Sequence, residues 1–152
     1  MTDFEEILKA LNDRFNEIKF TIQSLNNRVQ LTFQSQYQID YYYSVDISNE
    51  LRFISIGVVL KNQPNNLYFW STGMEFSNAS DFETIGKEYL FEQLEILIGN
   101  RTQIIQKKSV FAQTFTLEYY KDGVWKVLDK NNAFRFSNFI FPKIDKKIEI
   151  YR

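Results

Sequence analysis

Three consecutive tyrosines, Tyr41, Tyr42 and Tyr43, lie between two aspartates, Asp40 and Asp46. Aromatic rings beside carboxylates can anchor a partner, because a ring supplies contact area and a carboxylate supplies charge-assisted hydrogen bonds. Adjacent residues of a β-strand point to opposite faces of the sheet, so three rings in a row cannot form one stacking surface. The alternation of apolar and polar residues places the first and third rings on the apolar face. Only Tyr42 is expected on the polar face.

The polar face around Tyr42 is expected to carry small residues with aromatic and acidic residues around them. In the expected registers Tyr42 lies opposite Gly57, and Ser55 lies opposite Gly73. A floor of small residues lets either a helix or loop of the same chain or a binding partner approach closely, and both readings stay open. On the second reading, the sequence predicts a partner-binding surface. Its residues are Asp40, Tyr42, Asp46, Glu50, Phe53 and Phe69.

The chain contains no histidine and no cysteine. This composition excludes a Ser-His-Asp relay, histidine or thiolate zinc sites, thiol catalysis and disulfide bonds. The five glycines are too scattered to form a phosphate-binding loop. We therefore expect a protein that is not an enzyme and has no catalytic residues, no metal site and no cofactor.

The charged residues are unevenly distributed along the sequence. Residues 1–100 hold 14 acidic and 7 basic residues, a net charge of −7, whereas residues 101–152 hold 5 acidic and 11 basic residues, a net charge of +6. The two parts either neutralise each other in the fold or form a polarised surface that steers a charged partner. Lysines and arginines among exposed rings would also suit single-stranded nucleic acid. The basic residues concerned are Lys107, Lys108, Lys121, Lys126, Lys130, Arg135, Lys143, Lys146 and Lys147.

The elements that position these residues are mostly strands. A chain of 152 residues fits a single domain, residues 1–152, and its 15 Phe and 9 Tyr favour sheet. Apolar residues at helical spacing predict an N-terminal helix, and a second helix is predicted over about 81–98. Ser80 and Glu83 predict a capping box at the start of the second helix, and Gly99 can end it. Residues 29–47 alternate between apolar odd and mostly polar even positions, which indicates a sheet with one buried face.

The alternating run must bend, because 19 extended residues would span roughly 60 Å in a domain only about 40 Å across. The sequence leaves open whether residues 34–36 form a three-residue turn that pairs Phe33 with Tyr37 or a bulge in a continuous strand. A two-residue turn at Asn26-Asn27, where asparagine tolerates positive φ, would pair Ile22 with Leu31, and one at Asn49-Glu50 would pair Val45 with Ile54. A five-residue loop at 62–66 would set Val58 beside Trp70, and a three-residue turn at 121–123 would set Tyr119 against Trp125.

These patterns predict an α+β fold in which both helices pack on one bent antiparallel meander of about seven to nine strands. The N-terminus carries early acids and no apolar run, and the longest apolar run, 54–60, is too short to cross a membrane. We expect a cytoplasmic protein that does not contact a membrane. The richness in Asn, Lys, Ile, Phe and Tyr is weakly typical of a bacterial, AT-rich genome.

For function, the sequence favours a non-catalytic protein that binds another protein. The specific hypothesis is a bacterial immunity protein that neutralises a cognate toxin by occluding it, the partner being a basic toxin or nuclease domain that meets the acidic strand face. One alternative is a small-ligand-binding α+β domain with an apolar pocket under the second helix. Another is nucleic-acid binding through the basic C-terminal third. The oligomeric state stays open.

Overall fold

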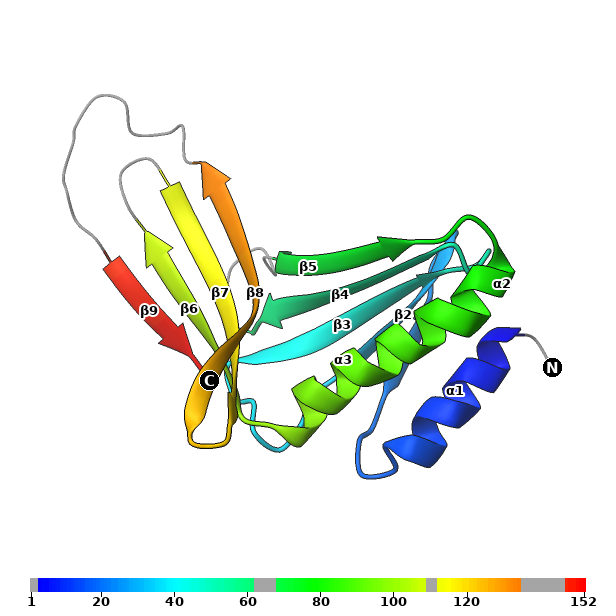
Figure 1. Cartoon of the computed structure of the whole chain (residues 1–152), viewed down its shortest axis with the longest axis horizontal. Helices are drawn as coiled ribbons and strands as arrows, with labels where there is room; N and C mark the ends of the chain where they lie inside the picture. Colours follow the sequence, from blue (N-terminus) through cyan, green and yellow to red (C-terminus); the bar gives the residue numbers. More distant parts are fainter. Residues whose placement is uncertain (1–2, 62–67, 109–111, 135–146) are drawn as a thin grey trace.

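The computed structural model describes residues 3–61, 68–108, 112–134 and 147–152. Its helical segments are α1 (Asp3–Arg14), α2 (Ala79–Asp81), the π-helical turn η1 (Phe82–Gly86) and α3 (Lys87–Gly99). The last three follow one another without a break (Figure 1). The described strands are β1 (Thr21–Ser24), β2 (Arg28–Phe33), β3 (Tyr41–Ser48), β4 (Phe53–Leu60), β5 (Tyr68–Glu75), β6 (Thr102–Lys108), β7 (Ala112–Lys121), β8 (Val124–Phe134) and β9 (Lys147–Tyr151).

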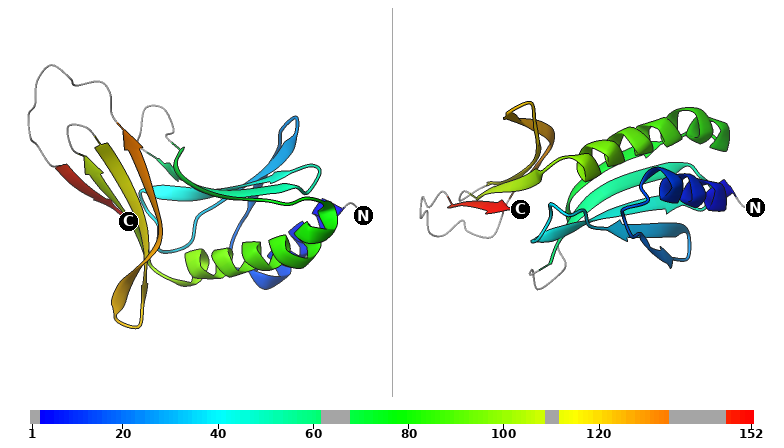
Figure 2. Two further views of the ribbon diagram at one scale, coloured as in Figure 1. Left: turned by 45° about the horizontal axis from the view of Figure 1, so that its top comes forward. Right: turned by 90° about the horizontal axis from the view of Figure 1, so that it is seen from below.

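The strands form two antiparallel sheets. The first has the order β1-β2-β3-β4-β5, and the second has the order β8-β7-β6-β9. The α+β class is confirmed, but the expectation of a single bent sheet is wrong. The helical segment between β5 and β6 carries the chain away from the first sheet, so β6 begins a separate one at the end where β3 starts (Figures 1 and 2).

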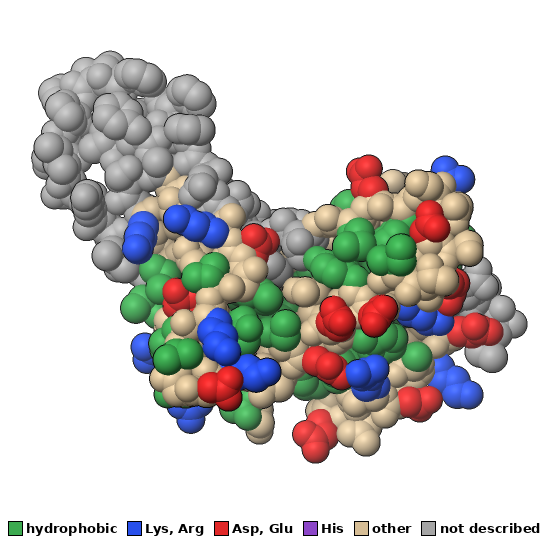
Figure 3. Space-filling view, in the orientation of Figure 1, with side chains coloured by type: hydrophobic (Ala, Val, Ile, Leu, Met, Phe, Trp, Pro, Cys, Tyr) green, Lys and Arg blue, Asp and Glu red, His purple; other side chains and the backbone are tan. Residues whose placement is uncertain are grey.

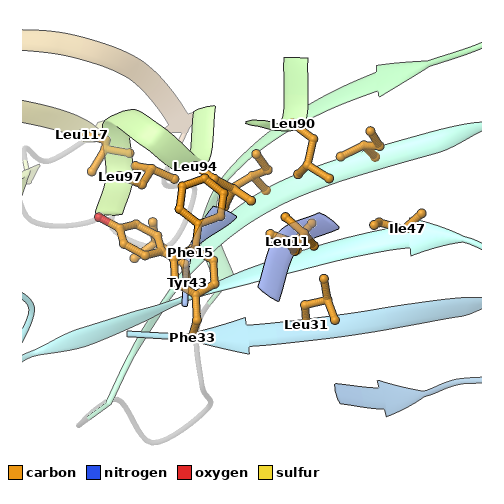
Figure 4. Close-up of a cluster of buried hydrophobic side chains, with 14 of the residues drawn as sticks. Leu11, Phe15, Leu31, Phe33, Tyr43, Ile47, Leu90, Leu94, Leu97 and Leu117 are labelled. Carbon is orange, nitrogen blue, oxygen red and sulfur yellow. The ribbon is translucent and has the colours of Figure 1, made fainter. Parts of the chain in front are cut away.

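The core lies between the helices and one face of the first sheet. Figure 4 shows leucines of α1 and α3 directed onto the strands, and Leu90, Leu94 and Leu97 of α3 are fully buried. Tyr41 and Tyr43 are buried on the same face, as the alternation predicted. Phe15, the residue after α1, and Phe91 of α3 stack with centroids 6.2 Å apart, which joins the two helices side by side.

Several strand registers are confirmed. Ile22 pairs with Leu31 across the Asn26-Asn27 turn, although neither asparagine adopts the positive φ expected there. Between β4 and β5, Val58 faces Trp70, and Ser55 faces Gly73. The predicted loop at 62–66 lies outside the described residues.

The register between β3 and β4 differs from the prediction by two residues. Val45 pairs with Ile56 rather than Ile54, because the connection has four residues, 49–52, instead of two. The hydroxyl of Ser48 accepts hydrogen bonds from the backbone N–H groups of Arg52 and Phe53, at 2.9 and 3.1 Å. Leu51 adopts a φ of 54°, and burial of its side chain offsets that strain.

Both predictions for residues 34–36 are wrong. Phe33 pairs with Tyr43, not Tyr37, so residues 34–40 form a long connection rather than a tight turn or a bulged strand. Two glutamine side chains replace the missing ladder: Gln38 Oε1 accepts the Ser35 N–H at 2.8 Å, and Gln34 Nε2 donates to the Gln38 carbonyl at 2.6 Å. These bonds stabilise the loop without strand pairing.

The β7–β8 hairpin turns over two residues, where the sequence predicted three. Asp122 and Gly123 both have positive φ, 55° and 82°, as a type I′ turn requires. Tyr120 therefore faces Trp125, whereas Tyr119 was the expected partner. A bulge lies farther along the hairpin, between Leu117 and Glu118.

The helix termini also differ from the expected caps. The second helical segment starts at Asn78, whose Oδ1 accepts the Asp81 N–H at 2.9 Å, instead of a Ser80–Glu83 capping box. Its end is closed by Asn100 Nδ2, which donates to the Ile96 carbonyl. Within the described residues, no helix is long and apolar enough to span a membrane.

Candidate functional site

The predicted partner surface lies on the face of the first sheet opposite the helices. Register shifts rearrange it: Tyr42 lies opposite Val59, and Ser44 takes the expected place opposite Gly57. Gly57 faces Ser71 across the next strand pair, as expected. A row of small residues therefore crosses the sheet, but Tyr42 stands beside the row rather than over it.

The two aspartates of that surface are engaged within the chain. Asp46 is buried, accepts a hydrogen bond from Gln30 Nε2 at 3.0 Å, and lies 3.8 Å from Arg28 Nε. Asp40 Oδ2 accepts the backbone N–H of Arg152 at 3.0 Å. Neither carboxylate stands free to form an acidic rim for a partner.

Two other predicted residues, Glu50 and Phe53, lie at the far end of the sheet. They line a groove of about 650 Å³ between the strand connections, which we call the turn groove. Its lining residues are Asn26, Asn27, Ser48, Asn49, Glu50, Arg52, Phe53, Glu75 and Phe76. Phe69 belongs to β5, but its side chain lies outside the described part of the chain. Of the five predicted residues whose side chains are described, only Glu50 and Phe53 line the turn groove.

A second groove lies at the opposite end of β3, where the two sheets meet. It encloses about 550 Å³ and is called here the aromatic groove. Its lining comes from the 34–40 connection, the α3–β6 junction, the β7–β8 hairpin and the end of the chain: Gln36, Tyr37, Arg101, Thr102, Tyr120, Trp125 and Arg152. The three rings are 36–41% exposed. Large rings with this much free surface are available for contact with a second molecule.

A buried hydroxyl network fixes the inner wall of the aromatic groove. The hydroxyls of Tyr41 and Tyr43 both contact Thr102 Oγ1, the latter at 2.7 Å, and Gln38 Nε2 donates to the same oxygen at 3.0 Å. A hydroxyl has one proton and two acceptor positions, so these three partners saturate Thr102. Burial raises the pKa of Tyr41 to about 12 and raises that of Tyr43 well above its ordinary value.

The hairpin turn sets the outer wall. Tyr120 and Trp125 are cross-strand neighbours with ring centroids 5.2 Å apart and an interplanar angle of 60°. The Tyr120 N–H donates to the Arg101 carbonyl at 2.8 Å, which ties the hairpin to the start of β6. Both rings therefore rest on strand backbone rather than on a free loop.

The third wall is closed by backbone bonds at the end of β9. The carbonyl of Arg152 accepts N–H groups from Ile39 and Asp40, at 2.9 and 2.8 Å. Together with the bond from the Arg152 N–H to Asp40, these contacts lock the 34–40 connection against β9. Tyr37 is held in the groove wall by this connection.

Charge distinguishes the arginines of this groove from the others. Among the described residues, Arg14, Arg28 and Arg52 each form an ion pair, with Glu95, Asp46 and Glu50 respectively. Arg101 and Arg152 form no ion pair within that same part of the chain. Their guanidinium groups are exposed and free to bind an incoming anion.

The wider surface is polarised. The described helices carry nine acidic and three basic residues. The four strands of the second sheet carry six basic and three acidic residues. Figure 3 shows acidic side chains gathered over the helices and basic ones over the second sheet. The aromatic groove lies at the basic end.

The groove can bind but offers little reactive chemistry. Its side chains supply ring faces, two guanidinium groups, an amide and three hydroxyls. In the described part of the chain, no group of three or more acidic residues is arranged to hold a metal ion. The arrangement can stack on flat or apolar groups and form charge-assisted hydrogen bonds with anions.

The sequence pattern did not identify the aromatic groove. Its lining residues come from four segments of the chain. The sequence pattern placed two of these residues elsewhere: Tyr37 on the apolar face of the sheet, and Trp125 opposite Tyr119. The Asp122-Gly123 dipeptide was an available signal, since it favours a two-residue type I′ turn and so pairs Tyr120 with Trp125. Comparison with protein-family models, curated proteins and solved structures gave no match.

Proposed function

We propose that this protein is a non-catalytic binding protein that acts on another protein, as a bacterial immunity protein neutralises a toxin by occluding it. The aromatic groove is the proposed docking site. The observation that carries the proposal is the gathering of one tryptophan, two tyrosines and two unpaired arginines in one concave surface. Trp, Tyr and Arg are the residue types that most often dominate the binding energy of protein interfaces.

Aliphatic residues next to the groove support a protein partner over a nucleic acid. Ile39 is 74% exposed and bonds through its backbone to Arg152. Val127, on the strand that carries Trp125, and Ile150, two residues before Arg152, are half exposed or more. Burying aliphatic side chains against an apolar protein surface contributes favourable binding free energy. A nucleic-acid ligand would cover them with sugar and phosphate instead.

The direct experiment measures the affinity of the product of the neighbouring gene for three forms of this protein. Wild type is compared with Trp125→Ala and with Ile22→Ala, which removes an exposed apolar side chain from the distant β1 edge. Truncating a central anchor costs about 2 kcal/mol or more, so Trp125→Ala should weaken binding at least roughly thirtyfold. Equal affinities for all three forms would contradict the proposed site.

Nucleic-acid binding is a second candidate, favoured by the basic second sheet beside exposed rings. Single-stranded nucleic acid would stack on Tyr120 and Trp125 and place phosphates near Arg101 and Arg152. Affinity for an oligo(dT) strand would then fall steeply with salt, in proportion to the phosphates neutralised. A flat salt response, or no binding, removes this candidate.

A basic toxin or nuclease domain, the partner expected from the acidic residues, would fit the turn groove better than the aromatic groove. Glu50 and Glu75 line it. Glu75→Gln tests that option, because it removes one charge at the end opposite Trp125. The apolar-pocket alternative is less favoured, since the space under α3 is filled by Leu90, Leu94 and Leu97 against the sheet.

A further inference from the structure

The charged side chains that line the aromatic groove are all basic. Its lining contains two arginines and no carboxylate side chain. The acids nearest in sequence are engaged elsewhere: Glu118 accepts Gln103 Nε2 at 2.8 Å, and Asp122 lies 3.4 Å from Lys126 Nζ. The Asp40 carboxylate lies beside this groove, where it accepts the backbone N–H of Arg152 at 3.0 Å. Neither arginine side chain forms an ion pair within the described residues, so both can pair with carboxylates of a molecule that occupies the groove.

Both arginines project from backbone that is fixed before any ligand arrives. Arg152 is held through its N–H by Asp40 and through its carbonyl by two further N–H groups. Arg101 follows the Asn100 cap of α3, and its carbonyl accepts the Tyr120 N–H. Because their backbone is already fixed, less conformational entropy is lost when a guanidinium group forms two parallel hydrogen bonds with a carboxylate.

The rings determine what must accompany the carboxylates. Tyr120 and Trp125 meet at 60°, so they form an angled wall instead of two parallel faces between which a base would insert. An angled aromatic wall with exposed Ile39 beside it fits a branched or aromatic side chain that inserts at one point. The groove thus combines an apolar anchor position with two anion positions.

We infer that the docking segment of the partner is acidic and carries one large apolar or aromatic side chain. Its carboxylates pair with Arg101 and Arg152 while the anchor side chain packs against Trp125, Tyr120 and Tyr37. This inference rests on the proposed function, that the partner is a protein. The contacting surface of the partner is then acidic, whereas Asp40 and Asp46 suggested a basic one.

Trp125 provides a native reporter for the test, since the chain contains only one other tryptophan. The emission of the full-length protein is followed while three probes are added. They are a short glutamate-rich peptide with one central leucine, the same peptide with lysines for glutamates, and an oligo(dT) strand. We expect a saturable change with the acidic peptide and none with the lysine peptide, and no change in Trp125→Phe. A stronger response to oligo(dT) that falls steeply with salt would overturn the inference in favour of nucleic acid.

Variants separate this inference from the proposed function. The double variant Arg101→Gln/Arg152→Gln should bind the acidic peptide at least about tenfold more weakly than wild type. Arg101→Lys/Arg152→Lys should recover part of that affinity, because lysine restores the charge without the planar guanidinium group. Arg52→Gln, at the opposite end of the sheet, should bind as wild type does. If Trp125→Ala abolishes binding of the natural partner but Arg101→Gln/Arg152→Gln retains it, the inference fails and the proposed function stands. If neither change affects binding of the natural partner, the aromatic groove is not the docking site and the proposed function fails as it is placed here.

Discussion

The hydroxyl of Tyr43 in the first sheet lies 2.7 Å from the hydroxyl of Thr102, the first residue of the second sheet. Because Thr102 also bonds to Tyr41 and Gln38, this single buried oxygen joins β3, the 34–40 connection and β6. The position of the aromatic groove therefore depends on a polar contact inside the protein.

Thr102→Val should be strongly destabilising. It keeps the shape of the side chain but leaves two buried phenol groups and an amide without their shared partner, which costs about 2–3 kcal/mol. Urea unfolding measures the loss. Thr32→Val is the control, since the Thr32 hydroxyl forms no hydrogen bond in the described part of the chain, and it should stay within about 0.5 kcal/mol of wild type. Equal effects of the two changes would remove the structural role given to the network.

Stability should fall at alkaline pH because of the same tyrosines. The folded pKa of Tyr41 is about 12, above the ordinary value of 10.0, and that of Tyr43 is also raised. Between pH 10 and about 12 the unfolded chain loses phenol protons that the folded chain keeps. The stability that these tyrosines contribute is therefore complete below pH 10 and is lost as the pH rises above it. The slope is up to about 1.4 kcal/mol per pH unit for each tyrosine. Tyrosinate absorbance should show some of the nine tyrosines ionising only as the protein unfolds. Ionisation of all nine near pH 10 in the folded state would contradict the burial.

Two serines of β3, Ser44 and Ser48, should respond in opposite directions. Ser44 is buried, and within the described residues its Oγ has no hydrogen-bond partner, so Ser44→Ala should be neutral or stabilise by up to about 1 kcal/mol. Ser48 Oγ accepts two backbone N–H groups, so Ser48→Ala should lose about 1–2 kcal/mol. Thermal or urea unfolding of the pair provides the comparison. Loss of stability in Ser44→Ala would indicate that its hydroxyl has a partner.

Gly123 and Gly99 form a second matched pair. Gly123 has a φ of 82°, whereas Gly99 ends α3 without positive φ and has open space where an added methyl group would lie. Gly123→Ala should lose about 1 kcal/mol and weaken partner binding, because the turn sets Trp125 against Tyr120. Gly99→Ala should leave binding unchanged and raise stability by roughly 0.5–1 kcal/mol. Partner affinity and urea midpoints test both expectations, and unchanged binding in Gly123→Ala would separate the turn from the groove.

Side-chain parity could be predicted from the sequence for β3, whereas strand register was predicted for β1–β2 and β4–β5 but not for β3–β4 or β7–β8. Alternation alone placed Tyr41 and Tyr43 in the core, since the period of a strand is fixed by its pleat. Register depends on the length of each turn, and the Ser48 hydroxyl favours a four-residue connection that no residue count reveals. A change of two residues keeps the parity and moves every pair, which is why Tyr42 faces Val59.

The candidate site was missed for a related reason. Tyr37 fits the alternating pattern, but the bonds of Gln34 and Gln38 remove its loop from the sheet and leave its ring exposed. Arg101 and Arg152 are separated by the whole second sheet in sequence and meet only because the 34–40 connection closes on the end of β9. Surfaces assembled from distant segments follow from tertiary contacts, which local patterns do not specify.

The most direct test of the aromatic groove is hydrogen–deuterium exchange on the complex with the natural partner. We predict that partner binding slows exchange at residues 36–40, 101–103 and 119–126 and leaves residues 48–53 and 75–76 unchanged. Protection confined to 48–53 and 75–76 would place the partner at the turn groove and contradict the account.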